Sequence, residues 1–126
     1  MIVLDSSALV QAFLVDRSAR DRMRDGGLQA PFLIDSEVLS VLRGHVLGRR
    51  MTVTYAEATI ADLQRLDLSR HSAVPLAARI WELRTNLTAY DACYVALAER
   101  LGCPLVTADV RIARAPGLRC PVDVVA

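Results

Sequence analysis

Four acidic side chains stand where one metal site could use them: Asp5, Glu37, Asp91 and Asp109. Carboxylates that converge without a fixed lysine or arginine between them repel one another, and hard cations such as Mg²⁺ or Mn²⁺ relieve that repulsion. Such a site keeps metal-bound water, which suits the hydrolysis of a phosphodiester. Taken singly, each acid could equally be a helix cap or a partner of a helix dipole. The hypothesis therefore depends on all four reaching one place in the fold.

Short apolar runs alternate with helical patterns along the chain, and this order predicts where the acids lie. Strands are predicted at 2–4, 31–34, 68–72, 104–107 and 122–125. Helices are predicted at 6–15, 17–25, from 35 onward, at 55–66, 75–83 and 89–101, with a short one ending at 115. Thr88 is expected to cap the 89–101 helix and Gly102 to end it.

Strands that are apolar throughout and separated by helices indicate a parallel sheet covered on both faces. With right-handed crossovers this is a three-layer α/β/α sandwich with a mostly parallel sheet of four to five strands. Ligands of such sheets bind beyond the carboxyl ends of the strands. Asp5 directly follows the first strand and Asp109 lies two residues past the fourth, while Glu37 and Asp91 fall in the first turns of helices. All four are therefore expected at one edge of the sheet.

Length and charge narrow the possible functions. The chain has 126 residues, enough for a single domain (1–126), and a net charge of +1, so no global field attracts nucleic acid or a membrane. All 15 basic residues are arginine. The lack of lysine argues against Schiff-base chemistry, P-loop phosphate binding, and receiver-like or phosphatase-like phospho-aspartate sites. Ser7 also stands where the phosphatase pattern needs a second aspartate.

Cysteine usage and hydropathy indicate the cellular compartment in which the protein is expected. The three cysteines form no Cys-x-x-Cys pair and are odd in number, which disfavours both a disulfide framework and a zinc site. No signal peptide is recognised before Asp5, and no apolar stretch is long enough to span a bilayer. The arginine-only, alanine-rich composition is typical of a GC-rich bacterial genome. We expect a bacterial cytoplasmic protein that does not enter a membrane.

Four segments in order resemble the motifs of PIN domains. The opening Ile-Val-Leu-Asp-Ser-Ser-Ala-Leu-Val (2–10) resembles the strand that delivers the family's first metal-binding aspartate, and 35–38 is similar to the site of its glutamate. Residues 87–98 resemble its Tyr-Asp-Ala-x-Tyr-x-Ala helix, and 105–109 its Thr-x-Asp motif. The match runs from residue 1 to about residue 115, and the compact size resembles the VapC-type toxins of bacterial toxin–antitoxin pairs.

The resemblance implies a Mg²⁺- or Mn²⁺-dependent endoribonuclease that forms a homodimer and is silenced by a cognate VapB-type antitoxin. The four acids carry over as its catalytic cluster, and Ser7 and Thr107 as hydroxyls that orient the carboxylates. Some members have a further acidic or Asn residue after the Thr-x-Asp motif, but here Val110, Arg111 and Ile112 follow. The number of metal ions, one or two, is left open.

A mechanism follows as a hypothesis. Metal held by Asp5, Asp91 and Asp109 would activate water against the phosphorus, with Glu37 orienting that water, to leave 5′-phosphate and 3′-hydroxyl ends. A metal-free ribonuclease would need histidines, and the two present, His45 and His71, are expected away from the acidic edge.

Arg111 and Arg114 follow Asp109 closely and are the candidates for contact with RNA phosphates. The exposed side of the helices between residues 35 and 66 is a candidate surface for an antitoxin helix or a dimer partner. The alternative to an enzyme is a non-catalytic PIN-fold module that only binds RNA or a partner.

Overall fold

The computed structural model describes residues 1–14 and 17–125. The strands are β1 (Ile2–Leu4), β2 (Leu28–Pro31), β3 (Leu68–His71), β4 (Leu105–Thr107) and β5 (Val122–Val124). The helices are α1 (Ser6–Leu14), α2 (Arg17–Met23), α3 (Leu33–Leu47), α4 (Val53–Arg65), α5 (Ala77–Glu82), α6 (Ala89–Leu101) and α7 (Val110–Arg114). A 3₁₀ turn, η1 (Val74–Leu76), precedes α5.

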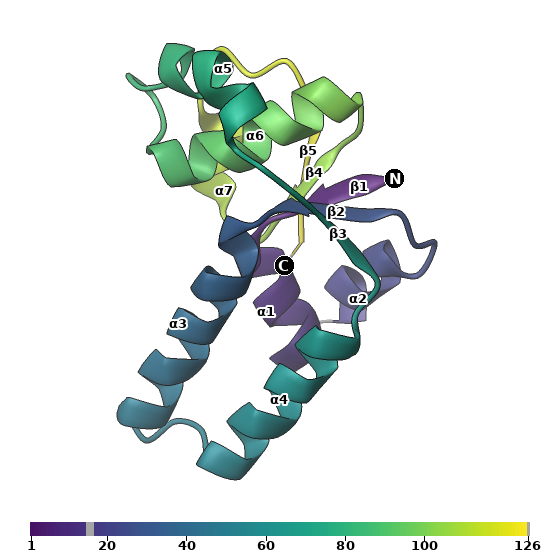
Figure 1. The fold of residues 1–126 in the computed structure, drawn as a ribbon, viewed down its shortest axis with the longest axis vertical. Helices are drawn as coiled ribbons and strands as arrows, with labels where there is room; N and C mark the ends of the chain where they lie inside the picture. Colours follow the sequence, from purple (N-terminus) through teal and green to yellow (C-terminus); the bar gives the residue numbers. More distant parts are fainter. Residues whose placement is uncertain (15–16, 126) are drawn as a thin grey trace.

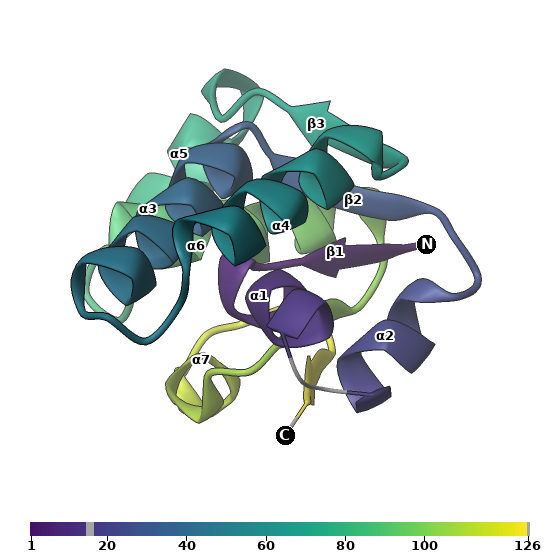
Figure 2. The same ribbon diagram turned by 90° about the horizontal axis from the view of Figure 1, so that it is seen from below.

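The five strands form one parallel sheet in the order β3-β2-β1-β4-β5. Figure 2 shows β3, β2 and β1 side by side, with β5 at the far end. Helices α5 and α6 cover one face, and α1 to α4 lie on the other (Figure 1). The predicted three-layer α/β/α sandwich is confirmed. Because every strand runs the same way, all five carboxyl ends lie at one edge of the sheet.

Helix α6 shows how local sequence sets an element that carries the site. The Thr88 side chain accepts a hydrogen bond from the backbone N–H of Asp91, so it caps the helix as predicted. Gly102 ends the helix in the left-handed conformation (φ 65°), which glycine adopts without a Cβ clash. The helix packs against the central strands, and its residues from Ala92 to Ala98 are buried.

The prediction for β2 and α3 is wrong by several residues. The strand ends at Pro31 and the helix begins at Leu33, so Ile34 is a buried helical residue rather than the end of a strand. A short apolar run such as 32–34 fits a buried helix as well as a strand, and pairing of β2 with β1 and β3 decides between them. Glu37 is therefore the fifth residue of α3, two residues further into the helix than predicted.

Two other boundaries differ. Helix α4 begins at Val53 rather than at 55, because Thr52 caps it by accepting the N–H of Tyr55. The helix predicted at 75–83 is divided into η1 and α5. The predicted end of the first helix at Val15 lies outside the described residues. Helices α3 and α4 run side by side in both views (Figures 1 and 2), and Figure 1 shows that they extend away from the sheet. Among the described helices, none is both long and apolar enough to cross a membrane.

Candidate active site

Asp5 lies at the carboxyl end of β1 and is 5% exposed. Its backbone N–H donates to the Val106 carbonyl (3.1 Å), which extends the pairing of β1 with β4 by one residue. Its Oδ1 accepts hydrogen bonds from the Ser7 hydroxyl (2.6 Å) and the Ala8 N–H (2.9 Å), and its Oδ2 accepts one from the Thr107 hydroxyl. Asp5 thus caps α1, which is the purely structural role that the sequence allowed. Two hydroxyls also hold its carboxylate in a fixed orientation.

Ser7 and Thr107 join the end of β4 to the end of β1. Their hydroxyl oxygens lie 3.2 Å apart. The Ser7 oxygen accepts the N–H of Ala108 (2.9 Å), and the Thr107 oxygen accepts the N–H of Asp109 (3.0 Å). Both hydroxyls therefore contact the backbone next to Asp109 while donating to Asp5, which is the orienting position predicted for them.

Asp91 comes to the same edge from the first turn of α6. Burial raises the pKa of Asp91 above its ordinary value; Arg111 opposes this shift, and repulsion from Asp109 adds to it. Burial also raises the pKa of Asp5, against the hydrogen bonds from Ser7, Thr107 and Ala8, and repulsion from Asp91 adds to the rise. The three aspartates therefore interact electrostatically, although they come from three elements far apart in the sequence.

Glu37 is held by Tyr94, the second tyrosine of the motif within residues 87–98. The Tyr94 hydroxyl donates to Glu37 Oε1 at 2.5 Å, and the Tyr94 side chain is 1% exposed. The pKa of Tyr94 is raised above its ordinary value by burial, then by its hydrogen bond to Glu37, with the charge of Asp5 adding. Tyr94 therefore lies between Glu37 and the other acids, and it points inward from α6 three residues after Asp91.

Arg111 forms an ion pair within the acidic site. Its guanidinium donates to both carboxylate oxygens of Asp109, with Nη2 to Oδ2 at 2.6 Å and Nε to Oδ1 at 3.1 Å. These hydrogen bonds lower the pKa of Asp109 below its ordinary value. The expectation that no arginine lies among the carboxylates is therefore wrong, because α7 turns Arg111 back onto the residue that caps it. Arg114 ends α7 and is exposed.

The donor atoms at this edge fit a hard divalent cation, although they are not already arranged around one. No three of the His, Cys, Asp and Glu side chains within residues 1–14 and 17–125 lie close enough to form a ready-made metal site. The groups present are nevertheless carboxylates and hydroxyls, the oxygen ligands that Mg²⁺ and Mn²⁺ prefer. A cation would relieve the mutual repulsion of Asp5, Asp91 and Asp109, and Asp109 would exchange Arg111 for it.

Comparison with known proteins gives the family. Residues 2–118 match the family model described as PIN domain. This chain belongs to the PIN domain family. VapC ribonuclease Mb0985 of Mycobacterium bovis is 44% identical over 125 residues, covering 99% of this chain and 98% of the relative. Ribonuclease VapC1 of Mycobacterium tuberculosis is 40% identical over 129 residues, covering 98% and 96%.

A solved structure shares the fold at low sequence identity. The structure of VapBC2 from Rickettsia felis, bound to a DNA fragment from their promoter, superposes with a TM-score of 0.72 at 14% identity. It covers 100% of both chains. At this identity the likeness concerns the PIN fold alone.

One histidine of this PIN domain, His71, lies nearer the carboxyl edge than the sequence predicts. His71 is the last residue of β3, where its Nε2 lies 2.6 Å from Gln29 Oε1. His45 lines a cavity together with Ser7, because α3 packs along α1 and keeps His45 facing it two turns after Glu37. The expectation that His71 lies away from the carboxyl edge is wrong, whereas His45 lies far along α3.

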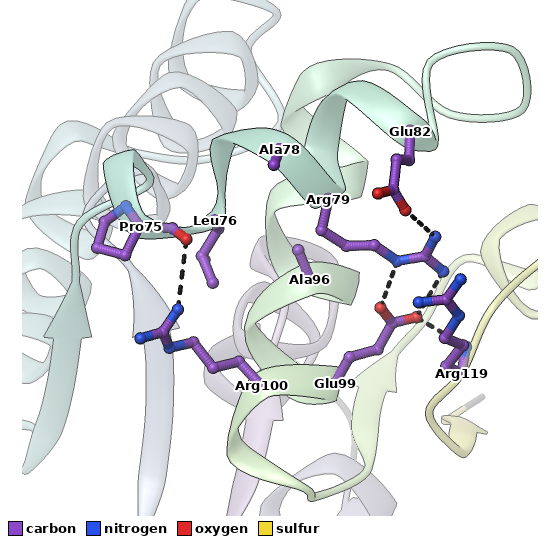
Figure 3. A pocket seen from close by; sticks show the side chains of 9 residues that line it. All are labelled: Pro75, Leu76, Ala78, Arg79, Glu82, Ala96, Glu99, Arg100 and Arg119. Atoms are coloured by element: carbon purple, nitrogen blue, oxygen red, sulfur yellow. Dashed lines mark hydrogen bonds and ion pairs between the residues drawn. The ribbon is translucent and has the colours of Figure 1, made fainter.

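A separate polar pocket lies over the far half of α6, away from the acids. Figure 3 shows Arg79 from α5 reaching Glu99 on α6, with Arg119 beside them. The Arg79 guanidinium donates to Glu99 (2.7 and 3.2 Å) and to the Gly117 carbonyl (2.7 Å), and the Arg119 N–H donates to Glu99 (2.7 Å). These contacts pair the charges of Arg79 and Glu99, and they hold residues 117–119, which precede β5, against α5 and α6.

Proposed function

We propose that this chain is a Mg²⁺- or Mn²⁺-dependent endoribonuclease. The observation that carries the proposal is the buried Asp5, which two hydroxyls hold at the carboxyl edge beside Asp91 and Asp109. A carboxylate that only capped a helix would not need a second oxygen held by Thr107 from another strand. The similar proteins Mb0985 and VapC1 are named ribonucleases, which supports RNA as the substrate.

Asp5, Asp91 and Asp109 are the residues that would hold the cation. When bound, a divalent ion supplies charge that lowers the pKa of a water molecule and stabilises the charge that develops on a phosphodiester. Ser7 and Thr107 orient the two oxygens of Asp5. Glu37, fixed by Tyr94 through Oε1, has its other carboxylate oxygen to orient the attacking water and accept its proton.

Arg111 and Arg114 are proposed to contact RNA phosphates. The Arg111 guanidinium neutralises Asp109, although 80% of its side chain is exposed. If Asp109 held a cation, the Arg111 guanidinium would be free to bind a substrate phosphate with two parallel hydrogen bonds.

The biological role we propose is that of the toxin in a type II pair with a VapB-type antitoxin. Helices α3 and α4 present an apolar groove of about 240 Å³ that includes the exposed side chains of Leu39, Leu47 and Val53. Such a groove fits one face of an amphipathic helix. The gene immediately upstream should encode a short DNA-binding antitoxin, and its co-expression should give a complex with suppressed cleavage. An upstream product that neither binds nor inhibits would refute the role.

We also propose that the chain forms a homodimer, as the family resemblance implies. Val74, Trp81 and Tyr90 form an exposed apolar patch, which is unusual on a monomer. Light scattering should give twice the mass of the chain, and Trp81→Glu tests whether this patch is the contact. A monomeric mass over a range of concentrations would contradict the dimer.

The proposed activity is tested by incubating the purified chain with RNA and Mg²⁺, with and without a chelator. Cleavage should stop with the chelator and in Asp5→Asn, and should leave 5′-phosphate ends. Asp67→Asn, at an exposed loop position, is the matched control and should cut normally. Cleavage that persists in Asp5→Asn would refute the metal mechanism. Binding of RNA without cleavage of any substrate tested would favour the alternative, a non-catalytic binding module.

A further inference from the structure

A pocket of about 380 Å³ opens between α1 and α3 beside the acids. Its α1 wall carries side chains spaced by three and four residues, so they share one helix face. These are Ser7, Val10, Gln11 and Leu14, and the α3 wall carries Val41 and His45.

The pocket is continuous with the candidate active site through Ser7. The hydroxyl that lines the pocket is the one that donates to Asp5 at 2.6 Å. Ala108, which also lines the pocket, donates its N–H to that hydroxyl and directly precedes Asp109. A group bound in the pocket would therefore lie next to whatever the acids hold.

The walls combine flat apolar surface with two polar groups. Val10, Leu14 and Val41 supply the apolar surface, and Gln11 on α1 and His45 on α3 supply the polar groups. Within residues 1–14 and 17–125, no hydrogen bond involves the Gln11 side chain. Unpaired RNA bases are recognised by apolar or aromatic contacts on their faces and by hydrogen bonds along their edges.

Arg50 adds a positive charge at the outer end of the pocket. Its Nε donates to His45 Nδ1 (3.2 Å) and its Nη2 to the Gly44 carbonyl (3.5 Å). Because Nδ1 accepts this hydrogen bond, the neutral ring carries its proton on Nε2 and can donate from there. His45 lies two turns after Glu37, about 12 Å along the helix axis. The Arg50 guanidinium would therefore lie near the backbone of an RNA strand that runs outward from the acidic residues.

We propose that this pocket binds one unpaired base adjacent to the cleaved phosphodiester, with Gln11 reading the base edge and His45 contacting its face. The proposal rests on the proposed function in that the ligand is RNA. A glutamine amide donates to and accepts from adenine in a matched pair of hydrogen bonds, so adenine is the base expected to bind best.

Binding is measured without cleavage by titrating AMP, GMP, CMP and UMP into the ¹⁵N-labelled full chain without metal. Backbone amide signals of Val10, Gln11, Val41 and His45 should shift, and AMP should bind about tenfold more tightly than UMP. Gln11→Ala should remove that difference, and Val10→Phe, which fills the pocket, should abolish the shifts. Gln64→Ala, an exposed glutamine on α4, is the matched control and should behave as the unmodified chain.

Shifts outside the pocket only, or an unchanged AMP preference in Gln11→Ala, would overturn the proposal. Shifts caused by a partner protein but by no nucleotide would assign the pocket to that protein and overturn it as well. A second measurement separates this proposal from the proposed nuclease activity. Oligoribonucleotides with randomised bases on either side of one cleavage site are digested, and the base preference of the unmodified chain is compared with that of Gln11→Ala. Cleavage with the same preference in both refutes the base pocket alone. Nucleotide binding without any cleavage refutes the nuclease alone.

Discussion

The Tyr94 hydroxyl donates a 2.5 Å hydrogen bond to Glu37 from a side chain that is almost wholly buried. The two residues lie 57 positions apart, on α6 and α3. Because α6 is packed against the sheet, the rigid layer of the fold fixes a carboxylate on a helix that extends away from it.

Tyr94→Phe keeps the buried ring and removes only this contact. We expect the free energy of unfolding to fall by about 1 kcal/mol and kcat to fall by about tenfold. The KM for RNA should change little, because the hydroxyl does not contact substrate. Tyr55→Phe, at an exposed position, is the control. Loss of stability with an unchanged kcat would show that Tyr94 acts only in packing.

Thr107→Val should be among the most damaging conservative changes. The valine leaves Asp5 Oδ2 and the N–H of Asp109 without the hydroxyl that contacts both. The residue at position 107 is fully buried. The expected cost in unfolding free energy is about 1–3 kcal/mol, with cleavage reduced as well. Thermal denaturation and cleavage assays measure the two effects.

Ser7→Ala tests whether the two hydroxyls act together. Because both donate to Asp5, the effects of Ser7→Ala and Thr107→Val on cleavage should not add in the double variant. Thr85→Val, exposed before α6, should leave both measurements unchanged. Strict additivity in a double-mutant cycle would argue against a shared role on Asp5.

Arg111→Ala removes the partner that lowers the pKa of Asp109. The carboxylate should then titrate nearer its ordinary value, as NMR of the Asp109 side chain would show. In cleavage assays the KM should rise and its dependence on salt should weaken by about one unit of slope, the effect of losing one phosphate contact. Arg65→Ala, on exposed α4, is the control. A KM and salt slope unchanged from the parent would remove Arg111 from the RNA interface.

Glu99 gives stability a defined dependence on pH. Burial raises the pKa of Glu99, but hydrogen bonds from Arg79 and the Arg119 N–H outweigh it, so the pKa lies below its ordinary value of 4.5 (Figure 3). A carboxyl with a lowered folded-state pKa stabilises the fold above its unfolded pKa and loses that contribution as pH falls through the folded one.

Glu99→Gln should therefore destabilise the chain by about 1–3 kcal/mol at pH 7. The loss of stability below pH 4.5 should also become shallower than in the parent. Glu57→Gln, on an exposed face of α4, is the matched control for urea denaturation across pH. An identical dependence of stability on pH in parent and variant would contradict this role of Glu99.

Local sequence predicts the position of a residue correctly where a single strand or helix decides it. Asp5 and Asp109 are placed by strand ends, and Asp91 by the Thr88 cap, and each lies where its local pattern indicates. It failed at the β2–α3 boundary, where an apolar run suits either state until the sheet pairs. Tyr94 belongs to the motif within residues 87–98, but a motif carries no information on a hydroxyl partner in another helix.

By itself, the sequence determined the fold class, the family motifs and the three aspartates at the edge, because strand ends and helix caps depend on residues within a few positions of one another. The tertiary structure alone decided that Thr107 holds Asp5 across 102 residues, that Tyr94 holds Glu37, and that Arg111 turns back onto Asp109. The first two depend on packing between elements, and the third on how α7 starts at the sheet edge. The two long-range hydrogen bonds, from Thr107 to Asp5 and from Tyr94 to Glu37, form only once the layers have assembled.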